Sequence, residues 1–172
     1  MRLHCIRHSR PRISGICYGH KDIAVEPFEL DLDITQVVHS CAAIYSSPSL
    51  RCLEMAHVYA GDQPVAADSR LMEMNFGEWE GIPWGEIPID QLDDWAANVS
   101  RFAPPAGESF ERLIARVSEW LNEVKVSSAA EQVAFTHGGV IKALRVLAFD
   151  ESYELAANYC PPFHQVVSFE FA

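Results

Sequence analysis

Two histidines at opposite ends of the chain have similar surroundings. His8 and His137 each follow an apolar run that is typical of a buried strand, and turn residues come after both. In an open α/β sheet, ligands bind outside the carboxyl ends of the strands, so two imidazoles placed there can face one pocket. Arg7 directly precedes one histidine, and Gly138 and Gly139 lead from the other into a predicted helix. This combination suits an anion, and phosphate most of all.

The hydrolysis of a phosphomonoester requires several groups at once, because the uncatalysed reaction is extremely slow. Arginine forks bind phosphoryl oxygens in one plane, a neutral histidine can attack phosphorus, and a carboxyl group can protonate the leaving oxygen. Predicted strand ends and first helical turns hold Arg7, His8, Arg51 and His137, and Glu73 lies just before a glycine-rich bend. The chain therefore offers a candidate for each role.

The elements that must position these residues alternate between strand and helix. Apolar runs predict strands at 3–7, 42–45, 63–66, 132–136 and 166–171. Helices are predicted from Ser47 as N-cap and Pro48 as first helical residue to about Tyr59, at 91–99 and at 140–149, with 28–41 partly helical. The clearest helix begins at Ser109, because apolar residues then recur on one face: Phe110, Leu113, Ile114, Val117, Trp120, Leu121 and Val124. This alternation predicts an α/β fold with a mostly parallel sheet covered on both faces.

Length and composition predict one soluble globular domain over residues 1–172. No apolar run approaches the roughly 20 residues of a membrane helix. The N-terminus is too short and too polar for a signal peptide, so a cytoplasmic protein is expected. The net charge of −11 argues against nucleic acid and anionic membranes as partners.

Charge and cysteine placement add two local expectations. Residues 1–21 contain lysine and arginine but no acidic residue, and Asp22 is the first. Such a basic segment in an acidic protein indicates a focused anion site, and the alternative is a chance cluster of solvated charges. The five cysteines are scattered without a C-x-x-C pair, which favours reduced thiols over disulfides or a zinc site.

Five short motifs occur in order along the chain. They are Arg7-His8, Ser46-Ser47-Pro48 with Arg51, Leu71-x-Glu73 with Gly77-x-Trp79-Glu80-Gly81, Gly107-Glu108-Ser109, and Thr136-His137-Gly138-Gly139. Together they resemble the histidine phosphatase superfamily, also called phosphoglycerate mutase-like, over about residues 2–147. Pro11 with Gly15-Ile16-Cys17-Tyr18-Gly19-x-x-Asp22 resembles the α-ribazole phosphatase-like branch of that superfamily.

The resemblance implies a fold, a reaction and a set of roles. The implied fold is a three-layer α/β/α sandwich whose central sheet is mostly parallel with one antiparallel strand. His8 would be the phosphorylated nucleophile, Arg7, Arg51 and His137 would hold the phosphate, and Glu73 would be the general acid. No metal or other cofactor is implied. The expected substrate is a small phosphorylated metabolite, with α-ribazole 5'-phosphate as the one that the branch suggests.

Some positions depart from the family pattern or leave alternatives open. Ser9 stands where the family usually has glycine, and Pro11 and Ser14 stand where many members have threonine and asparagine. Ser14, or a backbone N–H, is the candidate to replace the asparagine contact with phosphate.

The remaining polar residues of this region allow several further interpretations. Glu78 or Glu80 could be the acid in place of Glu73. His20 and His164 could line the pocket, and Arg10 and Arg12 could contact a second anionic group of the substrate.

Three functions are compatible with these residues. The first is a phosphatase, the second is a phosphomutase, and the third is a phosphate-binding protein without turnover. A mutase must keep water out, and the segment between Gly81 and Gly107 is short for a covering lid. The presence of both histidines, both arginines and Glu73 argues against loss of turnover. The oligomeric state and the physiological substrate are left open by the sequence.

Overall fold

The computed structural model describes residues 1–126 and 129–172 of the chain. Its strands are β1 (Arg2–Arg7), β2 (Ala43–Ser46), β3 (Val65–Ala67), β4 (Glu131–Thr136) and β5 (Val166–Glu170). Its α-helices are α1 (Leu32–Ser40), α2 (Leu50–Ala60), α3 (Ile89–Ala97), α4 (Phe110–Lys125), α5 (Gly138–Phe149) and α6 (Tyr153–Asn158). Three short 3₁₀ helices lie between β3 and α3, namely η1 (Ser69–Leu71), η2 (Gly77–Trp79) and η3 (Trp84–Glu86).

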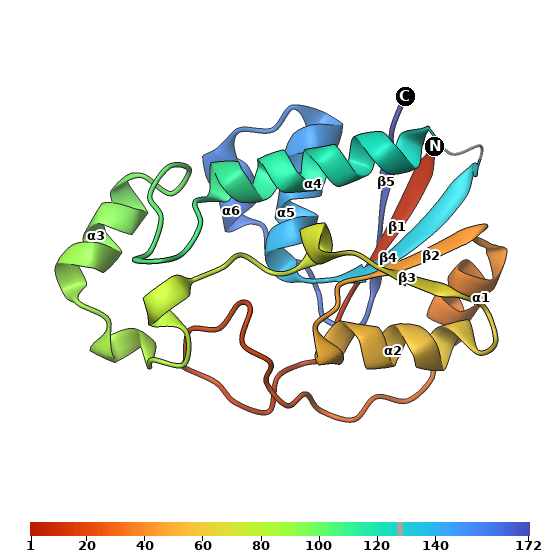
Figure 1. Cartoon of the computed structure of the whole chain (residues 1–172), viewed down its shortest axis with the longest axis horizontal. Helices are drawn as coiled ribbons and strands as arrows, with labels where there is room; N and C mark the ends of the chain where they lie inside the picture. The colour runs from red at the N-terminus through yellow and green to blue at the C-terminus, as the bar shows by residue number, and fades with distance from the viewer. Residues whose placement is uncertain (127–128) are drawn as a thin grey trace.

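The strands form one sheet in the order β3-β2-β4-β1-β5. All neighbours are parallel except β5, which pairs antiparallel with β1. Helices α4, α5 and α6 cover one face of the sheet, and α1 and α2 cover the other (Figure 1). The predicted three-layer α/β/α fold with one antiparallel strand is therefore confirmed.

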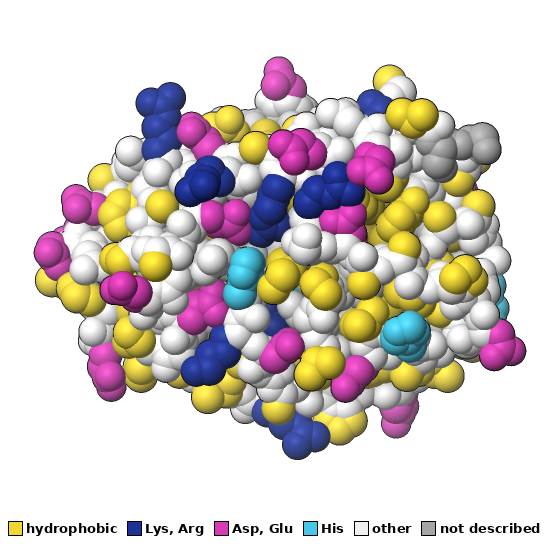
Figure 2. Space-filling model, in the orientation of Figure 1, with side chains coloured by type: hydrophobic (Ala, Val, Ile, Leu, Met, Phe, Trp, Pro, Cys, Tyr) yellow, Lys and Arg dark blue, Asp and Glu magenta, His cyan; other side chains and the backbone are white. Residues whose placement is uncertain are grey.

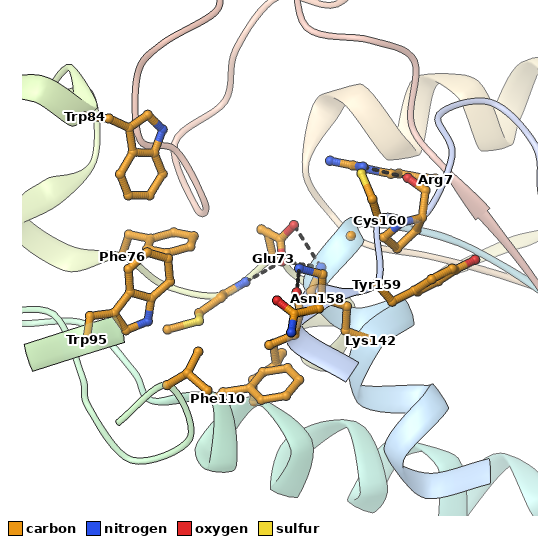
Figure 3. Close-up of a pocket in the computed structure, with 17 residues that line it drawn as sticks. Arg7, Glu73, Phe76, Trp84, Trp95, Phe110, Lys142, Asn158, Tyr159 and Cys160 are labelled. Atoms are coloured by element: carbon orange, nitrogen blue, oxygen red, sulfur yellow. Dashed lines mark hydrogen bonds between the residues drawn. The ribbon is translucent and has the colours of Figure 1, made fainter. Parts of the chain in front are cut away.

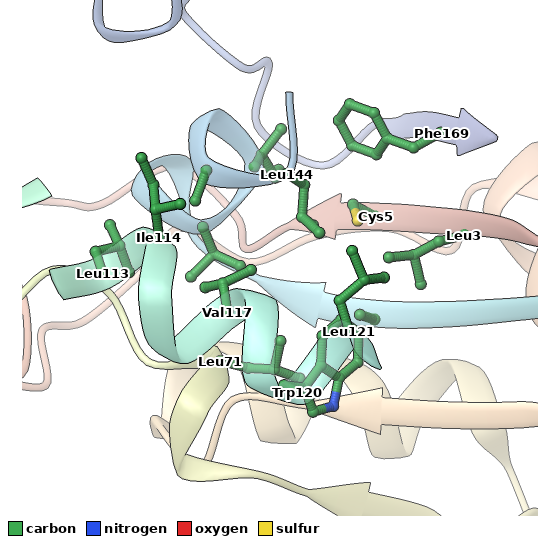
Figure 4. Close-up of a cluster of buried hydrophobic side chains, with 14 of the residues drawn as sticks. Leu3, Cys5, Leu71, Leu113, Ile114, Val117, Trp120, Leu121, Leu144 and Phe169 are labelled. Atoms are coloured by element: carbon green, nitrogen blue, oxygen red, sulfur yellow. The ribbon is translucent and has the colours of Figure 1, made fainter. Parts of the chain in front are cut away.

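Each face of the sheet is buried against its own hydrophobic cluster, because alternate side chains of a strand point to opposite faces. Leu3 and Cys5 of β1 pack with α4 and α5 in the larger cluster, which Figure 4 shows. Ile6 of β1 and Phe135 of β4 pack with α1 and α2 on the opposite face. Burial on both faces explains why these strands are apolar runs in the sequence.

Helix α4 presents the predicted apolar stripe to the larger cluster. All seven predicted residues are buried: Phe110, Leu113, Ile114, Val117, Trp120, Leu121 and Val124. Ser109 is the N-cap, and its side chain accepts a hydrogen bond from the Arg112 N–H at 3.3 Å. The periodicity and the cap agree, so this helix was predicted correctly.

The start of α2 was predicted wrongly. Its first helical residue is Leu50 with Ser49 as the N-cap, whereas the sequence suggested Pro48 and Ser47. The Ser47 hydroxyl lies 2.8 Å from the His137 ring Nε2 and also accepts the Ser49 N–H at 3.3 Å, just before the helix. The Leu50 N–H, which would otherwise be unpaired, donates to Asp22 Oδ1 at 3.1 Å. A carboxylate from a distant loop thus caps this helix.

Other boundaries differ by a few residues from the predicted ones. The strand predicted at 63–66 is β3, Val65–Ala67, and the helix predicted at 140–149 begins at Gly138. The helix predicted at 91–99 is α3, Ile89–Ala97, and α6 was not predicted. Within the part of the chain that the structure describes, no helix is both long and apolar enough to cross a bilayer.

The surface mixes charges of both signs. On the face seen in Figure 2, Lys and Arg side chains lie among Asp and Glu side chains rather than in a separate basic field. Arg116, for example, pairs with Glu108 at 2.6 Å, and Arg70 pairs with Glu123 at 2.8 Å.

Candidate active site

His8 and His137 lie next to each other because of the pairing between β1 and β4. The parallel register matches Arg7 with Thr136, so the residue after each strand emerges at the same edge of the sheet. The His8 N–H donates to the Thr136 carbonyl at 3.1 Å. The two imidazole centroids are 5.2 Å apart, with an interplanar angle of 63°.

The His8 ring is oriented so that one nitrogen is free. Its Nδ1 lies 2.7 Å from the Ser9 carbonyl oxygen, which can only accept, so Nδ1 carries the proton and Nε2 carries the lone pair. Burial lowers the pKa of His8 to about 3, with the charges of Arg51 and Arg7 acting in the same direction against the Ser9 hydrogen bond, which raises it. His8 is therefore a neutral imidazole with an available lone pair. Because Ser9 contributes its backbone, this contact does not depend on the residue type at position 9.

Arg51 in the first turn of α2 is held by the loop of residues 19–22. Its Nη2 donates to the Gly19 carbonyl at 2.6 Å. Its Nη1 donates to the Lys21 carbonyl at 3.1 Å and to Asp22 Oδ1 at 3.2 Å. These acceptors orient a guanidinium that is almost completely buried, which would otherwise be costly.

Arg7 at the end of β1 is held by the segment that leads into β5. Its Nη1 donates to the Pro161 carbonyl at 2.8 Å. The Phe163 ring lies 3.6 Å from the guanidinium carbon, a close cation–π contact. On another side is Gly138, where a Cβ would lie 3.2 Å from the same carbon.

His137 is the N-cap residue of α5 and is fully buried. Its Nε2 lies 2.8 Å from the Ser47 hydroxyl and 3.5 Å from Cys52 Sγ. Burial holds its pKa well below the ordinary value, and the charges of Arg51 and His8 act in the same direction. His137 is therefore neutral and can offer a ring N–H to an anion.

Glu73 lies over the N-terminus of α5. The Gly139 N–H lies 3.0 Å and 3.2 Å from its two carboxylate oxygens, and the Met74 N–H donates to Oε1 at 2.9 Å. A Cβ on Gly139 would overlap with Oε1, so a larger residue there would displace the Glu73 carboxyl group. These contacts keep the carboxyl group beside the first turn of α5, next to Gly138 and Arg7.

Three nitrogens of this cluster are unpaired although they are buried. Among the side chains that the structure describes, Arg7 Nε, His8 Nε2 and Arg51 Nε have no hydrogen-bond partner. Buried polar atoms are rarely left unpaired in folded proteins unless a function requires it. Two guanidinium donors and an imidazole lone pair are suited to a tetrahedral oxyanion.

A cavity of about 540 Å³ adjoins the cluster (Figure 3). Arg7, Glu73 and Gly138 line it, whereas His8, Arg51 and His137 are not among its lining residues. The wall farther from Arg7 is apolar, and Figure 3 shows the rings of Phe76, Trp84 and Trp95 there. The planes of Trp84 and Trp95 are nearly parallel, 9° apart, and Phe76 is edge-on to both.

Several residues considered from the sequence lie outside the cluster. Ser14 is exposed in the loop after β1 and makes no described side-chain hydrogen bond. The structure therefore does not bring it to the cluster of Arg7, His8, Arg51 and His137. Glu78 is exposed. Glu80 accepts the backbone N–H groups of His20 at 2.8 Å and Lys21 at 2.6 Å, so it braces the loop that holds Arg51.

The remaining ambiguous residues have other contacts. His164 Nε2 lies 2.6 Å from the Tyr59 hydroxyl, and His164 is not a lining residue of the cavity. Arg10 and Arg12 are exposed, and Arg12 donates to the Val25 carbonyl at 3.0 Å. Among the described residues, no group of three or more His, Cys, Asp or Glu is placed to hold a metal ion.

Sequence reasoning missed three residues that support the site. Asp22 is named from the sequence only as the first acidic residue and as part of a motif, yet it binds both Arg51 and the start of α2. Ser47 was assigned to a helix cap, although its hydroxyl contacts His137. Phe163 carries no local pattern that could have indicated its contact with Arg7.

Comparison with known proteins places the chain in a family. The sequence model of the histidine phosphatase superfamily (branch 1) matches residues 35–172, a stretch that contains Arg51, Glu73 and His137 and begins after His8. A protein of Hydrogenobacter thermophilus named "Putative phosphoserine phosphatase 2" is 32% identical over 155 residues, which cover 83% of this chain and 76% of that protein.

Solved structures share the fold over almost the whole chain. The α-ribazole phosphatase from Shigella flexneri has a TM-score of 0.82 at 20% identity and covers 100% of this chain and 91% of its own. Bacillus stearothermophilus YhfR has a TM-score of 0.78 at 25% identity and covers 99% and 91%. The family resemblance of the five motifs is thus confirmed, and the chain belongs to branch 1 of the histidine phosphatase superfamily.

Proposed function

We propose that the protein is a metal-independent phosphatase that hydrolyses a small phosphomonoester through a phosphohistidine on His8. The observation that carries this proposal is the group of three unpaired buried nitrogens, Arg7 Nε, His8 Nε2 and Arg51 Nε. They supply the donors that a phosphoryl group needs and the lone pair that can attack it. Membership of the histidine phosphatase superfamily supports the same reaction class.

In the first step, His8 Nε2 attacks phosphorus with its lone pair. The N–P bond forms as the P–O bond to the leaving group breaks, and that electron pair goes to the leaving oxygen. Glu73 donates a proton to this oxygen, so the alcohol leaves neutral. Arg7, Arg51 and a ring N–H of His137 bind the other phosphoryl oxygens, and the positive N-terminal end of α5 lies beside them.

In the second step, water attacks the phosphorus of the phosphohistidine. The Glu73 carboxylate takes a proton from this water as the new P–O bond forms. The P–N bond breaks, and its electron pair returns to His8 Nε2. Inorganic phosphate leaves, and both residues regain their starting protonation states.

For the substrate we propose α-ribazole 5'-phosphate. Its planar base suits the wall of Phe76, Trp84 and Trp95, because aromatic rings pair favourably with one another. Phosphoserine, suggested by the name of the 32% identical relative, is the alternative. Its ammonium and carboxylate groups would need charged partners, and Lys142, whose Nζ already donates to the Ala157 carbonyl at 2.7 Å, is the one lining charge beyond Arg7 and Glu73.

Replacement of the nucleophile tests the mechanism. His8→Ala is expected to lower the hydrolysis of p-nitrophenyl phosphate by roughly 10³-fold or more, since no other lone pair replaces Nε2. His39→Ala, at an exposed position of α1, is the matched control with unchanged activity. Acid-labile labelling with a ³²P substrate should be seen in the wild type and not in His8→Ala. Turnover that persists in the His8 variant, or that is lost with EDTA, would refute the mechanism.

Removal of the acid should depend on the leaving group. Glu73→Gln is expected to slow the hydrolysis of alkyl phosphates by about 10²–10⁴-fold, because an alkoxide leaves poorly without a proton. The loss should be smaller for p-nitrophenyl phosphate, whose leaving group needs little protonation. The control is Glu78→Gln, at an exposed carboxylate. Equal losses for both substrates would exclude Glu73 as the acid.

The depressed pKa of His8 predicts how stability depends on pH. Below the ordinary histidine pKa of 6.5 the unfolded chain takes up a proton at His8, whereas the folded protein, with a His8 pKa of about 3, does not. The free energy of unfolding should therefore fall as the pH falls, and His8 should account for about 2 kcal/mol of this loss at pH 5. Urea denaturation at pH 7.5 and 5 should show a loss smaller by that amount in His8→Gln. Identical losses would mean that His8 is protonated in the fold.

Substrate selection can be measured directly. The kcat/KM for α-ribazole 5'-phosphate is expected to exceed that for phosphoserine by at least about tenfold, because the apolar wall would leave the charged groups of phosphoserine unpaired. Trp84→Leu should reduce this ratio, whereas Trp79→Leu, at a buried ring that does not line the cavity, tests for a general loss of folding. A preference for phosphoserine would overturn the substrate proposal and leave the mechanism intact.

A further inference from the structure

We propose that Phe163 is a positioning residue that fixes the Arg7 guanidinium for phosphate. The inference rests on the proposed function only in taking Arg7 as a phosphate ligand. Phe163 lies just before β5, far in sequence from Arg7, and it is part of none of the five sequence motifs. The contact is therefore a product of the fold.

The Phe163 ring lies over Arg7, the last residue of β1, and beside His8, which follows it. Its centroid is 3.6 Å from the Arg7 guanidinium carbon and 5.7 Å from the His8 ring centroid. The ring is partly exposed, and it belongs to none of the three hydrophobic clusters found among the described residues. Packing of the core thus does not account for a phenylalanine at this position. The Arg10 guanidinium is the other cation near the ring, at 5.2 Å.

The segment that carries Phe163 is tied to Arg7 on both sides of the ring. Before it, the Pro161 carbonyl accepts Arg7 Nη1 at 2.8 Å. After it, the His164 N–H donates to the Arg7 carbonyl at 2.9 Å. His164 has a left-handed backbone with φ of 50°, and its ring is anchored by the Tyr59 hydroxyl at 2.6 Å. The Phe163 ring is thus held over the Arg7 guanidinium by a turn that binds both the backbone and the side chain of Arg7.

These contacts leave Arg7 little freedom. Phe163 covers the guanidinium, Pro161 takes one Nη, and Gly138 allows close approach on another side. The Arg7 Nε has no hydrogen-bond partner among the described residues, so it can donate to a phosphate oxygen. An arginine held in this way binds phosphate without first losing side-chain freedom, so the ring strengthens binding even though it need not touch the anion.

A double-mutant cycle tests this role by direct binding of inorganic phosphate, measured by calorimetry. Phe163→Leu keeps an apolar side chain but removes the aromatic face, and it is expected to weaken phosphate binding by roughly tenfold in the wild type. In an Arg7→Gln background the same change should weaken binding by less than about twofold, because the ring acts through Arg7. Phe163→Tyr, which retains the ring, should bind within about twofold of the wild type.

The controls separate positioning from stability. Phe102→Leu, at a partly buried ring stacked on Trp79, should leave phosphate binding unchanged. Thermal unfolding of every variant shows whether the fold is retained. Equal weakening by Phe163→Leu with and without Arg7, or no weakening at all, would overturn the proposal, as would a loss of binding in Phe163→Tyr. Phosphate binding is measured here without hydrolysis. The positioning role of Phe163 can therefore be disproved while catalysis by His8 is upheld, and catalysis by His8 can be disproved while the positioning role is upheld.

Discussion

The parallel pairing of β1 with β4 is the constraint on which the rest of the site depends. Its register matches Arg7 with Thr136, so the next residue of each strand, His8 and His137, leaves the sheet at the same edge. Since ladder hydrogen bonds run along both strands, a slip of the register would separate the two imidazoles. The start of α5 follows directly from β4, which brings the N-terminal end of this helix to the same place.

Burial then determines the chemistry of this edge. Low exposure keeps both imidazoles neutral, because a charged ring would lose its hydration. The two guanidinium groups are held in the same surroundings because backbone carbonyls and Asp22 accept their Nη hydrogens. The nitrogens left without partners, Nε of each arginine and Nε2 of His8, are the groups that the proposed oxyanion would pair with. These unpaired buried nitrogens lower the stability of the fold, and they are concentrated at this edge of the sheet.

The local sequence pattern predicted an element correctly where no tertiary contact competed with it. The seven apolar residues of α4 recur at helical spacing after a serine cap, and all are buried as expected. The start of α2 was predicted two residues too early. The Ser47 hydroxyl accepts the Ser49 N–H and contacts His137, and Asp22, from a distant loop, pairs with the Leu50 N–H where the helix begins. Boundaries such as that of β3 moved because strand ends depend on the neighbouring strand as well as on their own residues.

By itself, the sequence determined the α/β class and the parallel core strands, because strand runs and turn glycines are local properties of the chain. Motif order made Arg7, His8, Arg51 and His137 the candidates for the site. Only the tertiary structure decided how each of these residues is held. Asp22, Ser47, Pro161 and Phe163 reach the site from loops that follow no periodic pattern. It also placed the three carboxylates of one short segment differently: Glu73 is buried against the start of α5, Glu80 accepts backbone N–H groups of the loop at 19–22, and Glu78 is exposed. Such contacts join residues far apart in the chain, so neither residue alone carries a signal of the other.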